Sequence, residues 1–271
     1  MAAKTTMERV STADELKVQA AERSGGLDDF GAYGWEDGLE RLLESVEREA
    51  ALNSVGRAIL DEWICERLIN RLRVTDWTSS HPEVLDQRIE RPVVIVGMLR
   101  TATTILQELL GKDPRHRSLM KWEGLDCVPP PEARTFDSDP RIAPMVEKME
   151  ATYSMVPELK AVHFEPGNWP TECVALLGQC FRSQDWGGLF HLPSYSRWFM
   201  NCDMAPAYDY HRLCLRLLQS RAGGTWLLKA PGHMLALDAL TDAYPDARII
   251  VTHRDPLKTV PSSASLSVTA R

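Results

Sequence analysis

The chain has 271 residues, and 31 basic residues against 38 acidic ones leave a net charge of −7. Hydrophobic residues at 44% and charged residues at 25% are ordinary globular values, which excludes a disordered or collagen-like chain. The acidic balance argues against a general nucleic-acid binder but allows one locally basic pocket for an anion. The length indicates one large domain, or one domain with an appendage.

We expect no transmembrane helix. Its most apolar run, Val93 to Met98, is far too short to span a bilayer. Charges occupy the N-terminal positions where a secretory signal needs an apolar core, so we expect a cytoplasmic protein. The 6 cysteines contain no CxxC pair and are interpreted as reduced, mostly buried thiols rather than a zinc or disulfide framework.

The first ninety residues show helical patterns. Thr12 and Glu15 form a capping box for a helix that should end at Gly25. Apolar residues at helical spacing predict two more helices, over about 36–51 and 55–72. We expect residues 1–90 to form an N-terminal helical segment that packs on the core.

Beyond residue 90, short apolar runs alternate with helical patterns. Three runs are typical of strands buried on both faces, at Val93 to Gly97, Trp226 to Leu228 and Arg248 to Thr252. Helical patterns follow them at about 103–110, 233–243 and 257–266. These units predict an α/β domain over 91–271, in which a central parallel sheet is flanked by helices in three layers.

A long insertion separates the first two predicted strands, at about 122–222. It contains helical patterns near 141–155, 171–181 and 206–219. Ligands of open sheets bind beyond the carboxyl ends of the strands, so this insertion is placed to cover a substrate pocket.

The segment after the first strand indicates an anion site. The strand enters a short turn from Gly97, and a helix then opens on Thr103 and Thr104. Unpaired backbone N–H groups at such a helix start bind phosphate-like anions, and Arg100 adds a positive charge. The segment is not a nucleotide-hydrolase P-loop, because Ala102 and Thr103 stand where that motif has Gly and Lys.

The other two strands also end in cations. Lys229 and Arg254 should reach the same sheet edge as the loop after the first strand. Asp255 is the only nearby candidate metal ligand, and before Pro256 it is better interpreted as a helix N-cap. Three cations without a carboxylate cage favour a metal-free site for a multiply anionic ligand, although each alone could be an ordinary strand-end charge.

At these positions the sequence resembles sulfotransferases that use 3′-phosphoadenosine 5′-phosphosulfate (PAPS), and is most similar to the bacterial, tyrosylprotein-sulfotransferase-like branch. Gly97 to Thr104 resembles the family's 5′-phosphosulfate loop, Leu228 to His233 its second-strand segment, and Arg254 to Ser262 its 3′-phosphate motif. The resemblance runs from about Pro92 to the C-terminus and implies a P-loop-like fold.

Two positions depart from the family loop. Leu99 replaces a proline and Ala102 replaces a glycine. A β-carbon at position 102 would be strained if the turn needs a positive φ, whereas helical angles there would make alanine harmless.

The resemblance implies a role for each motif, with PAPS as the donor co-substrate and no metal. The residues that would hold the 5′-phosphosulfate are Arg100, Thr101, Ala102, Thr103 and Thr104. Lys229 would balance charge on the departing phosphate oxygen. Arg254 and Ser262 would bind the 3′-phosphate.

The acceptor needs a base, and the sequence offers two candidates. Glu123 occupies about the place of the family's catalytic glutamate, and desolvation beside Trp122 would raise its pKa. His163 is the second candidate. The competing interpretations are a surface glutamate and a packed structural histidine. Glu172 is interpreted as an acid in the first turn of a helix.

The acceptor itself is expected to be a small molecule that offers a hydroxyl or an amine. Four tryptophans lie in or near the insertion, namely Trp122, Trp169, Trp186 and Trp198. They suit an apolar or aromatic acceptor pocket, but core packing explains them equally well. The sequence leaves open whether the protein is a homo-oligomer.

Two other functions compete with sulfotransfer. One is a P-loop kinase or other nucleotide-binding protein, and the second is a truncated, non-catalytic sulfotransferase relic. The family continues beyond the helix that carries Ser262, so Arg271 is interpreted as a truncation point. We therefore expect reduced stability, weak activity or rescue by a partner chain.

Overall fold

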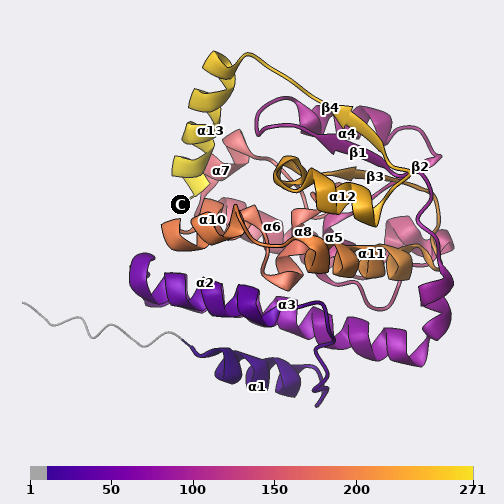
Figure 1. Ribbon diagram of the computed structural model, residues 1–271, viewed down its shortest axis with the longest axis horizontal. Coiled ribbons are helices and arrows are strands. Elements are labelled where there is room, and N and C mark those ends of the chain that lie inside the picture. Colours follow the sequence, from indigo (N-terminus) through magenta and orange to yellow (C-terminus); the bar gives the residue numbers. More distant parts are fainter. Residues whose placement is uncertain (1–10, 271) are drawn as a thin grey trace, which may run out of the picture.

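A four-stranded parallel sheet lies at the centre of the protein. The computed structural model describes residues 11–270. The strands are β1 (Val93–Val96), β2 (His116–Ser118), β3 (Thr225–Lys229) and β4 (Arg248–Val251), in the spatial order β2-β3-β1-β4 (Figure 1). Every pair is parallel, which confirms the predicted α/β class.

Helices cover both faces of the sheet. In Figure 1, α12 lies in front of the strands and the fainter α4 lies behind them. The helices run α1 Ala13–Arg23, α2 Glu36–Glu49, α3 Ser54–Ser80, α4 Thr103–Leu110, α5 Lys121–Leu125, α6 Ile142–Met155, α7 Pro157–Val162, α8 Val174–Leu177, α9 Gln184–Leu189, α10 Pro193–Phe199, α11 Ala205–Gln219, α12 Leu237–Ala243 and α13 Pro256–Ala270. Short 3₁₀ segments span Pro82–Asp86, Ala133–Ser138, Gly178–Cys180 and Pro231–Leu235.

The strand register brings three strand ends to one edge. Val93 of β1 lies opposite Leu227 of β3 and Arg248 of β4. The segments that follow these strands therefore leave the sheet together. This arrangement follows from parallel pairing, in which the carboxyl ends of neighbouring strands meet on the same side.

The prediction that all three strands are buried on both faces is wrong for β4. Residues of β1 and most of β3 are buried, whereas Ile249 and Val251 of β4 are 38% and 68% exposed. The reason is that one face of β4 is open: Ile249 and Val251 share that face, whereas Ile250 on the opposite face packs against Val93, Ile95 and Leu227.

The predicted helix boundaries hold where local signals fix them. The Thr12 hydroxyl accepts the backbone N–H of Glu15, and the Glu15 carboxylate accepts that of Thr12, which confirms the capping box. However, α3 continues to Ser80 rather than ending near residue 72. Of the helix predicted over 171–181, only α8 is α-helical, and Gly178–Cys180 continues it as a 3₁₀ segment.

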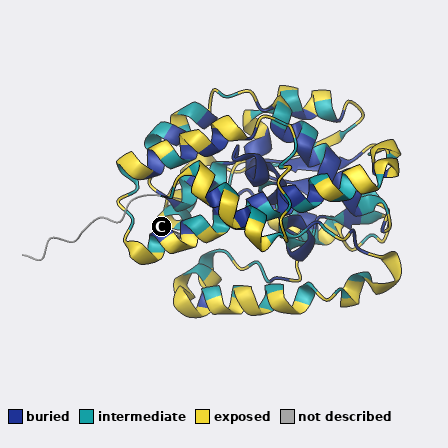
Figure 2. Ribbon diagram, turned by 90° about the horizontal axis from the view of Figure 1, so that it is seen from below, coloured by how far each residue is buried: buried dark blue, intermediate teal, exposed yellow. Residues whose placement is uncertain are grey.

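The N-terminal helices share one hydrophobic core with the rest of the chain. Leu16 of α1, Leu42 of α2 and Leu68 of α3 are fully buried and belong to the same cluster as Leu217 and Tyr244. Figure 2 shows the buried residues gathered around the sheet, with exposed residues along the outer helices. The division at about residue 90 stays a prediction.

The structure also bears on the expected thiols and membrane segments. All 6 cysteines are free, and all but Cys202 are buried. None of the helices within residues 11–270 is both long and apolar enough to cross a membrane. The N-terminal residues that argued against a secretory signal lie largely outside the described residues.

Two buried histidines, His211 of α11 and His233 of the 3₁₀ segment after β3, each pair with a tyrosine. The Nδ1 atom of His211 lies 2.6 Å from the Tyr244 hydroxyl, and that of His233 lies 2.7 Å from the Tyr208 hydroxyl. Both side chains are fully buried, and burial lowers the pKa of each to about 3. Both histidines are therefore neutral in the folded protein near pH 5.

This pair predicts a steep loss of stability in mild acid. Below about pH 6.5 the unfolded chain binds protons that the folded chain cannot, so each histidine should lower the free energy of unfolding by about 1.4 kcal/mol per pH unit. Urea denaturation between pH 7 and pH 5 measures this slope. His233→Phe should make the slope shallower, and the same slope in both proteins would contradict the assignment.

Candidate functional site

The loop between β1 and α4 adopts a left-handed turn. Arg100 and Ala102 have φ angles of 69° and 70°, and Ala102 is the N-cap residue of α4. The alanine side chain makes no capping hydrogen bond. The N–H groups of the first turn of α4 therefore remain available to an anion.

A glycine at position 97 is required by close packing. A Cβ there would overlap the Thr252 hydroxyl at the end of β4. The Thr101 hydroxyl lies 2.7 Å from that of Thr252 and donates to the Met98 carbonyl, also at 2.7 Å. These contacts fix the loop against β4, and sequence reasoning missed the part that Thr252 plays.

Ala102 has a positive φ, so of the two conformations considered in the sequence analysis the loop adopts the strained one. Ala102→Gly is expected to raise the free energy of unfolding by up to about 1 kcal/mol, because the left-handed penalty of alanine exceeds the entropy cost of glycine. Urea denaturation measures the change. Ala58→Gly in the exposed, helical part of α3 is the matched control and should be destabilising by a similar amount. Equal destabilisation by both substitutions would contradict this account.

Arg100, a residue of this loop, contacts Arg254 and Ser262. Arg100 Nε donates to Ser262 Oγ at 3.0 Å, and Arg254 Nη1 donates to the Arg100 carbonyl at 3.1 Å. Arg100 Nη1 also donates to the Val162 carbonyl, at 3.0 Å. Figure 1 shows α13, which carries Ser262, standing beside α7, which ends at Val162. The structure therefore brings Arg100, Arg254 and Ser262 together.

The helix that carries Ser262 begins as predicted. The Asp255 carboxylate accepts the N–H of Leu257 at 3.0 Å, and Pro256 is the first residue of α13. Asp255 is thus engaged as an N-cap. Among residues 11–270, no group of three His, Cys, Asp or Glu side chains is arranged to hold a metal ion.

Lys229 lies at the end of β3 and is only 2% exposed. Its Nζ donates to Glu172 Oε1 at 2.7 Å and to Thr104 Oγ1 at 3.3 Å. The backbone N–H of Cys173 donates to the Lys229 carbonyl at 2.9 Å. A buried ammonium thus joins the start of α4 to a carboxylate from the insertion.

Glu172 lies before α8 and not in its first turn, contrary to the prediction. The N–H groups of its two neighbours, Thr171 and Cys173, donate to the carbonyls of Leu119 and Lys229. These bonds fix the segment against Leu119 and the end of β3. The Glu172 side chain keeps 15% of its surface exposed, against 3% for that of Lys229.

Two further acids surround this position. Burial and the neighbouring Glu172 carboxylate raise the pKa of Asp185, at the start of α9, to about 6. Glu165 accepts Lys121 Nζ at 2.5 Å, and Lys121 with His163 holds the pKa of Glu165 well below its usual range despite burial. Sequence reasoning missed Asp185, because its closeness to Glu172 exists only in the fold.

His163 lies near the β1–α4 loop, and its side chain lies beside the Glu165 carboxylate. Its Nε2 lies 3.7 Å from Glu165 Oε2, and 43% of its side-chain surface is exposed. The preceding residue, Val162, supplies the carbonyl that Arg100 binds. Its role as a base stays a prediction.

Glu123 has a different environment from the one expected of a catalytic base. It is fully buried, and its two carboxylate oxygens accept Arg117 Nη1 and Nη2 at 3.2 and 2.7 Å. One of them also accepts the Met120 N–H at 3.0 Å. Burial raises the pKa of Glu123. These bonds explain the residue as a structural partner of Arg117, and its role as a base stays an untested prediction.

The four tryptophans of the expected aromatic pocket form two groups that differ in burial. Trp122 and Trp186 are 1% exposed core residues, whereas Trp169 is 36% exposed and Trp198 is half-buried. Core packing therefore accounts for the first two.

The geometry as a whole suits a reaction between an anion and a group that must lose a proton. A helix start, two arginines and a buried lysine would bind anionic oxygens. The carboxylate of Glu172 lies within hydrogen-bond distance of the lysine and could accept a proton.

Comparison with known proteins identifies relatives among the sulfotransferases. The profile of the sulfotransferase family matches residues 92–271, which is more than half of the chain. A curated relative, omega-hydroxy-beta-dihydromenaquinone-9 sulfotransferase Stf3 of Mycobacterium bovis, is 27% identical over 181 residues, covering 65% of this chain and 45% of that protein. The chain thus spans about half the length of the curated relatives it matches.

Two crystal structures resemble the whole chain. Sulfotransferase STF1 from Mycobacterium tuberculosis is 35% identical with a TM-score of 0.85, over 96% of this chain and 72% of that one. Sulfotransferase STF9 from Mycobacterium avium is 33% identical with a TM-score of 0.89, over 97% of this chain and 68% of that one. Together with the family match, these similarities show that the chain belongs to the sulfotransferase family.

Proposed function

We propose that this chain transfers a sulfonate group from PAPS to the hydroxyl of a small-molecule acceptor. The observation that carries the proposal is the placement of Lys229, whose buried ammonium joins the α4 start at Thr104 to the carboxylate of Glu172. A donor bound at α4 and an acceptor activated by Glu172 would meet at this lysine.

The residues around the loop fit a donor with two separate anionic groups. We assign the 5′-phosphosulfate to Arg100 and to the backbone of residues 101–104, where the left-handed turn leaves N–H groups available. Arg254 and Ser262 lie beside the same loop and are assigned to the 3′-phosphate. Both arginines are exposed, so their side chains can exchange present partners for phosphate oxygens.

The chemistry that the bound donor supplies is a sulfonate held by a phosphate leaving group. Lys229 would donate a hydrogen bond to the phosphate oxygen as its bond to sulfur breaks. The acceptor oxygen forms the new bond to sulfur, and Glu172 takes the proton that this oxygen loses. We choose Glu172 over Glu123 and His163 because its carboxylate oxygen Oε1 lies 2.7 Å from Lys229 Nζ.

The acceptor proposal draws on a relative. The Mycobacterium bovis protein is named for an omega-hydroxy compound, which is an alcohol. Among the bases considered, a carboxylate such as Glu172 is suited to an alcohol that transfers its proton as the bond to sulfur forms. We therefore propose an alcohol acceptor for this chain.

Calorimetry with the reaction product adenosine 3′,5′-bisphosphate tests the donor site. We expect saturable, magnesium-independent binding that is weakened about tenfold or more by Arg254→Ala, since bonds to charged groups contribute about 1.5–3 kcal/mol each. Arg248→Ala, at an exposed arginine at the start of β4, is the matched control and should bind like the wild type.

This titration, together with assays of ATP turnover and sulfonate transfer, separates the competing functions. Binding that survives Arg254→Ala unchanged would contradict the assigned phosphate site. Magnesium-dependent binding and turnover of ATP would support a kinase instead. Tight bisphosphate binding without any transfer would support a non-catalytic nucleotide-binding protein.

A further inference from the structure

Arg100, which we assign to the donor, is held by a carbonyl of the insertion. Its Nη1 group donates to the Val162 carbonyl at 3.0 Å, and its Nε donates to Ser262 Oγ at 3.0 Å. A guanidinium carries more N–H donors than these two bonds use, and within residues 11–270 no acceptor binds the Nη2 group. Arg100 can therefore bind an oxygen of the phosphosulfate while it keeps its bond to Val162.

The direction of the Val162 carbonyl is fixed by its own peptide unit. The C=O of Val162 and the N–H of His163 belong to one planar, trans peptide, in which the two groups point in opposite directions. The His163 N–H donates to the Leu159 carbonyl at 2.8 Å, which closes the last turn of α7. The Val162 carbonyl therefore points out of the end of α7, where Arg100 binds it.

The residues that follow Val162 are held by Tyr153 of α6. The N–H of Glu165 donates to the Tyr153 hydroxyl at 2.7 Å, and the same hydroxyl lies 3.5 Å from the His163 carbonyl. Tyr153 is only 4% exposed, and its ring packs 5.7 Å from that of Phe164. The hydroxyl thus lies against main-chain groups on both sides of Phe164, directly after the carbonyl that binds the arginine.

The same segment fits closely against the backbone of α6. A Cβ on Gly167 would overlap the main chain of Met145, so a glycine is required there. The Glu165 side chain is also engaged, because its Oε2 accepts Lys121 Nζ at 2.5 Å. The segment from Val162 to Gly167 is therefore fixed by main-chain and side-chain contacts, of which the Tyr153 hydroxyl is one that a single substitution can remove.

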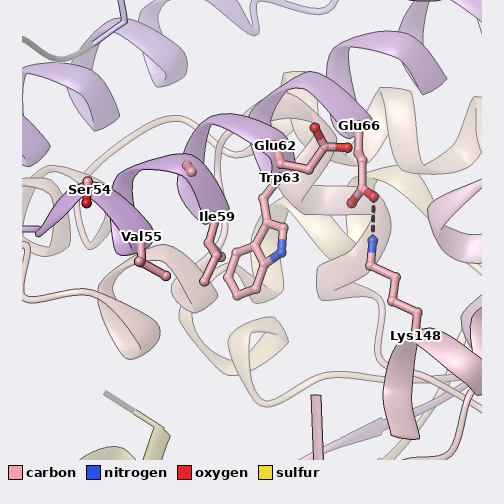
Figure 3. Close-up of a pocket in the computed structure, with 8 residues that line it drawn as sticks. Ser54, Val55, Ile59, Glu62, Trp63, Glu66 and Lys148 are labelled. Atoms are coloured by element: carbon pink, nitrogen blue, oxygen red, sulfur yellow. Dashed lines mark hydrogen bonds and ion pairs between the residues drawn. The ribbon is translucent and has the colours of Figure 1, made fainter. Parts of the chain in front are cut away.

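Helix α6 is itself held by contacts outside the donor site. At its start, the Arg141 guanidinium packs over the Trp122 ring at 4.8 Å. Further along, Lys148 pairs with Glu66 of α3 beside a surface pocket (Figure 3). Tyr153 lies near the end of this helix and can therefore fix the segment whether or not a donor is bound.

We infer that Tyr153 is a positioning residue for donor binding: its hydroxyl fixes the segment that presents the Val162 carbonyl, and this carbonyl orients Arg100 toward the 5′-phosphosulfate. This inference rests on the proposed function, since it concerns the same donor site. An oriented guanidinium loses less conformational freedom when the donor binds, so the bonds at Tyr153 raise the affinity for the donor. Tyr153 acts through Val162 and Arg100 and needs no contact with the donor.

Calorimetry of Tyr153→Phe with adenosine 3′,5′-bisphosphate tests the inference, because this variant loses the hydroxyl and keeps the ring. We expect the Kd to rise about three- to tenfold, which corresponds to the net contribution of one hydrogen bond. Tyr244→Phe is the matched control: it removes another buried hydroxyl, 2.6 Å from His211 Nδ1, and should leave the Kd unchanged. An unchanged Kd in Tyr153→Phe would overturn the inference.

A double-mutant cycle separates positioning from a purely structural role. In an Arg100→Lys background, Tyr153→Phe should weaken binding no further, because lysine lacks the planar fork that can bind Val162 and the donor together. Equal weakening in both backgrounds would show that the hydroxyl acts without Arg100, and would overturn the inference. Gly167→Ala displaces the same segment by a different route and should also raise the Kd, with Gly223→Ala, which has room for a Cβ, as its control.

The wild-type titration keeps this inference distinguishable from the proposed function. If the wild-type protein shows no saturable binding of the bisphosphate, the donor site itself is wrongly assigned and both proposals fall. If the wild type binds it saturably and Tyr153→Phe binds equally well, the positioning role falls and the donor site stands.

Discussion

Replacing Glu172 by glutamine is expected to lower kcat for sulfonate transfer at least a hundredfold. General-base catalysis typically contributes about 10²–10⁴-fold, and an amide cannot accept the proton of the acceptor hydroxyl. The amide oxygen can still accept the hydrogen bond from Lys229, so the site should keep its shape. The measurement is the initial rate at saturating donor and acceptor.

Two controls make the Glu172 result interpretable. Calorimetry should show that Glu172→Gln binds adenosine 3′,5′-bisphosphate like the wild type, which establishes that the donor site is intact. Glu165→Gln removes a neighbouring carboxylate that is engaged by Lys121, and should retain most of the activity. Full activity in Glu172→Gln together with its loss in His163→Ala would instead identify the histidine as the base.

Arg117→Ala is expected to lower the free energy of unfolding by about 3–5 kcal/mol, the usual cost of breaking a buried ion pair. The substitution leaves the Glu123 carboxylate buried without its guanidinium, and the arginine side chain is only 6% exposed. It also removes the packing of that guanidinium over the Trp226 ring at 4.0 Å. Urea denaturation at neutral pH measures the loss.

A matched control lies two residues away. Arg115 pairs with Asp113 at 2.5 Å, but 85% of its side-chain surface is exposed. Exposed pairs contribute at most about 1 kcal/mol, so Arg115→Ala should be close to neutral. Equal losses in the two variants would refute the structural role assigned to Arg117. If Glu123 has a structural role, Glu123→Gln should have a larger effect on the free energy of unfolding than on kcat measured per folded molecule.

The elements that sequence reasoning placed correctly are those with local signals. The capping box at Thr12, the helix start at Thr103 and the N-cap at Asp255 each depend on residues within a few positions of one another. The convergence of Arg100 and Arg254 was also predictable, because parallel strands bring their carboxyl ends to one edge.

The acidic part of the site could not be predicted in the same way. Glu172 and Lys229 are 57 positions apart, and nothing in the sequence around Glu172 indicates that it lies beside the lysine. Glu123 was favoured because of its position relative to the loop. Its burial is decided by Arg117, on a three-residue strand that lacks the β-branched run of the others.

The error at β4 has a physical cause. An apolar, β-branched run indicates that a segment suits a sheet, but it does not indicate whether both faces of the strand are covered. In the fold, the face of β4 that carries Ile249 and Val251 is open, and Val251 is 68% exposed.

β4 is also an edge strand, which has a consequence for handling the protein. A strand edge with open backbone groups and exposed apolar side chains is a template for further strands, and such edges promote aggregation at high concentration. Natural sheets commonly prevent this with a lysine on the edge strand. Val251 is 68% exposed on β4, so Val251→Lys should reduce such pairing.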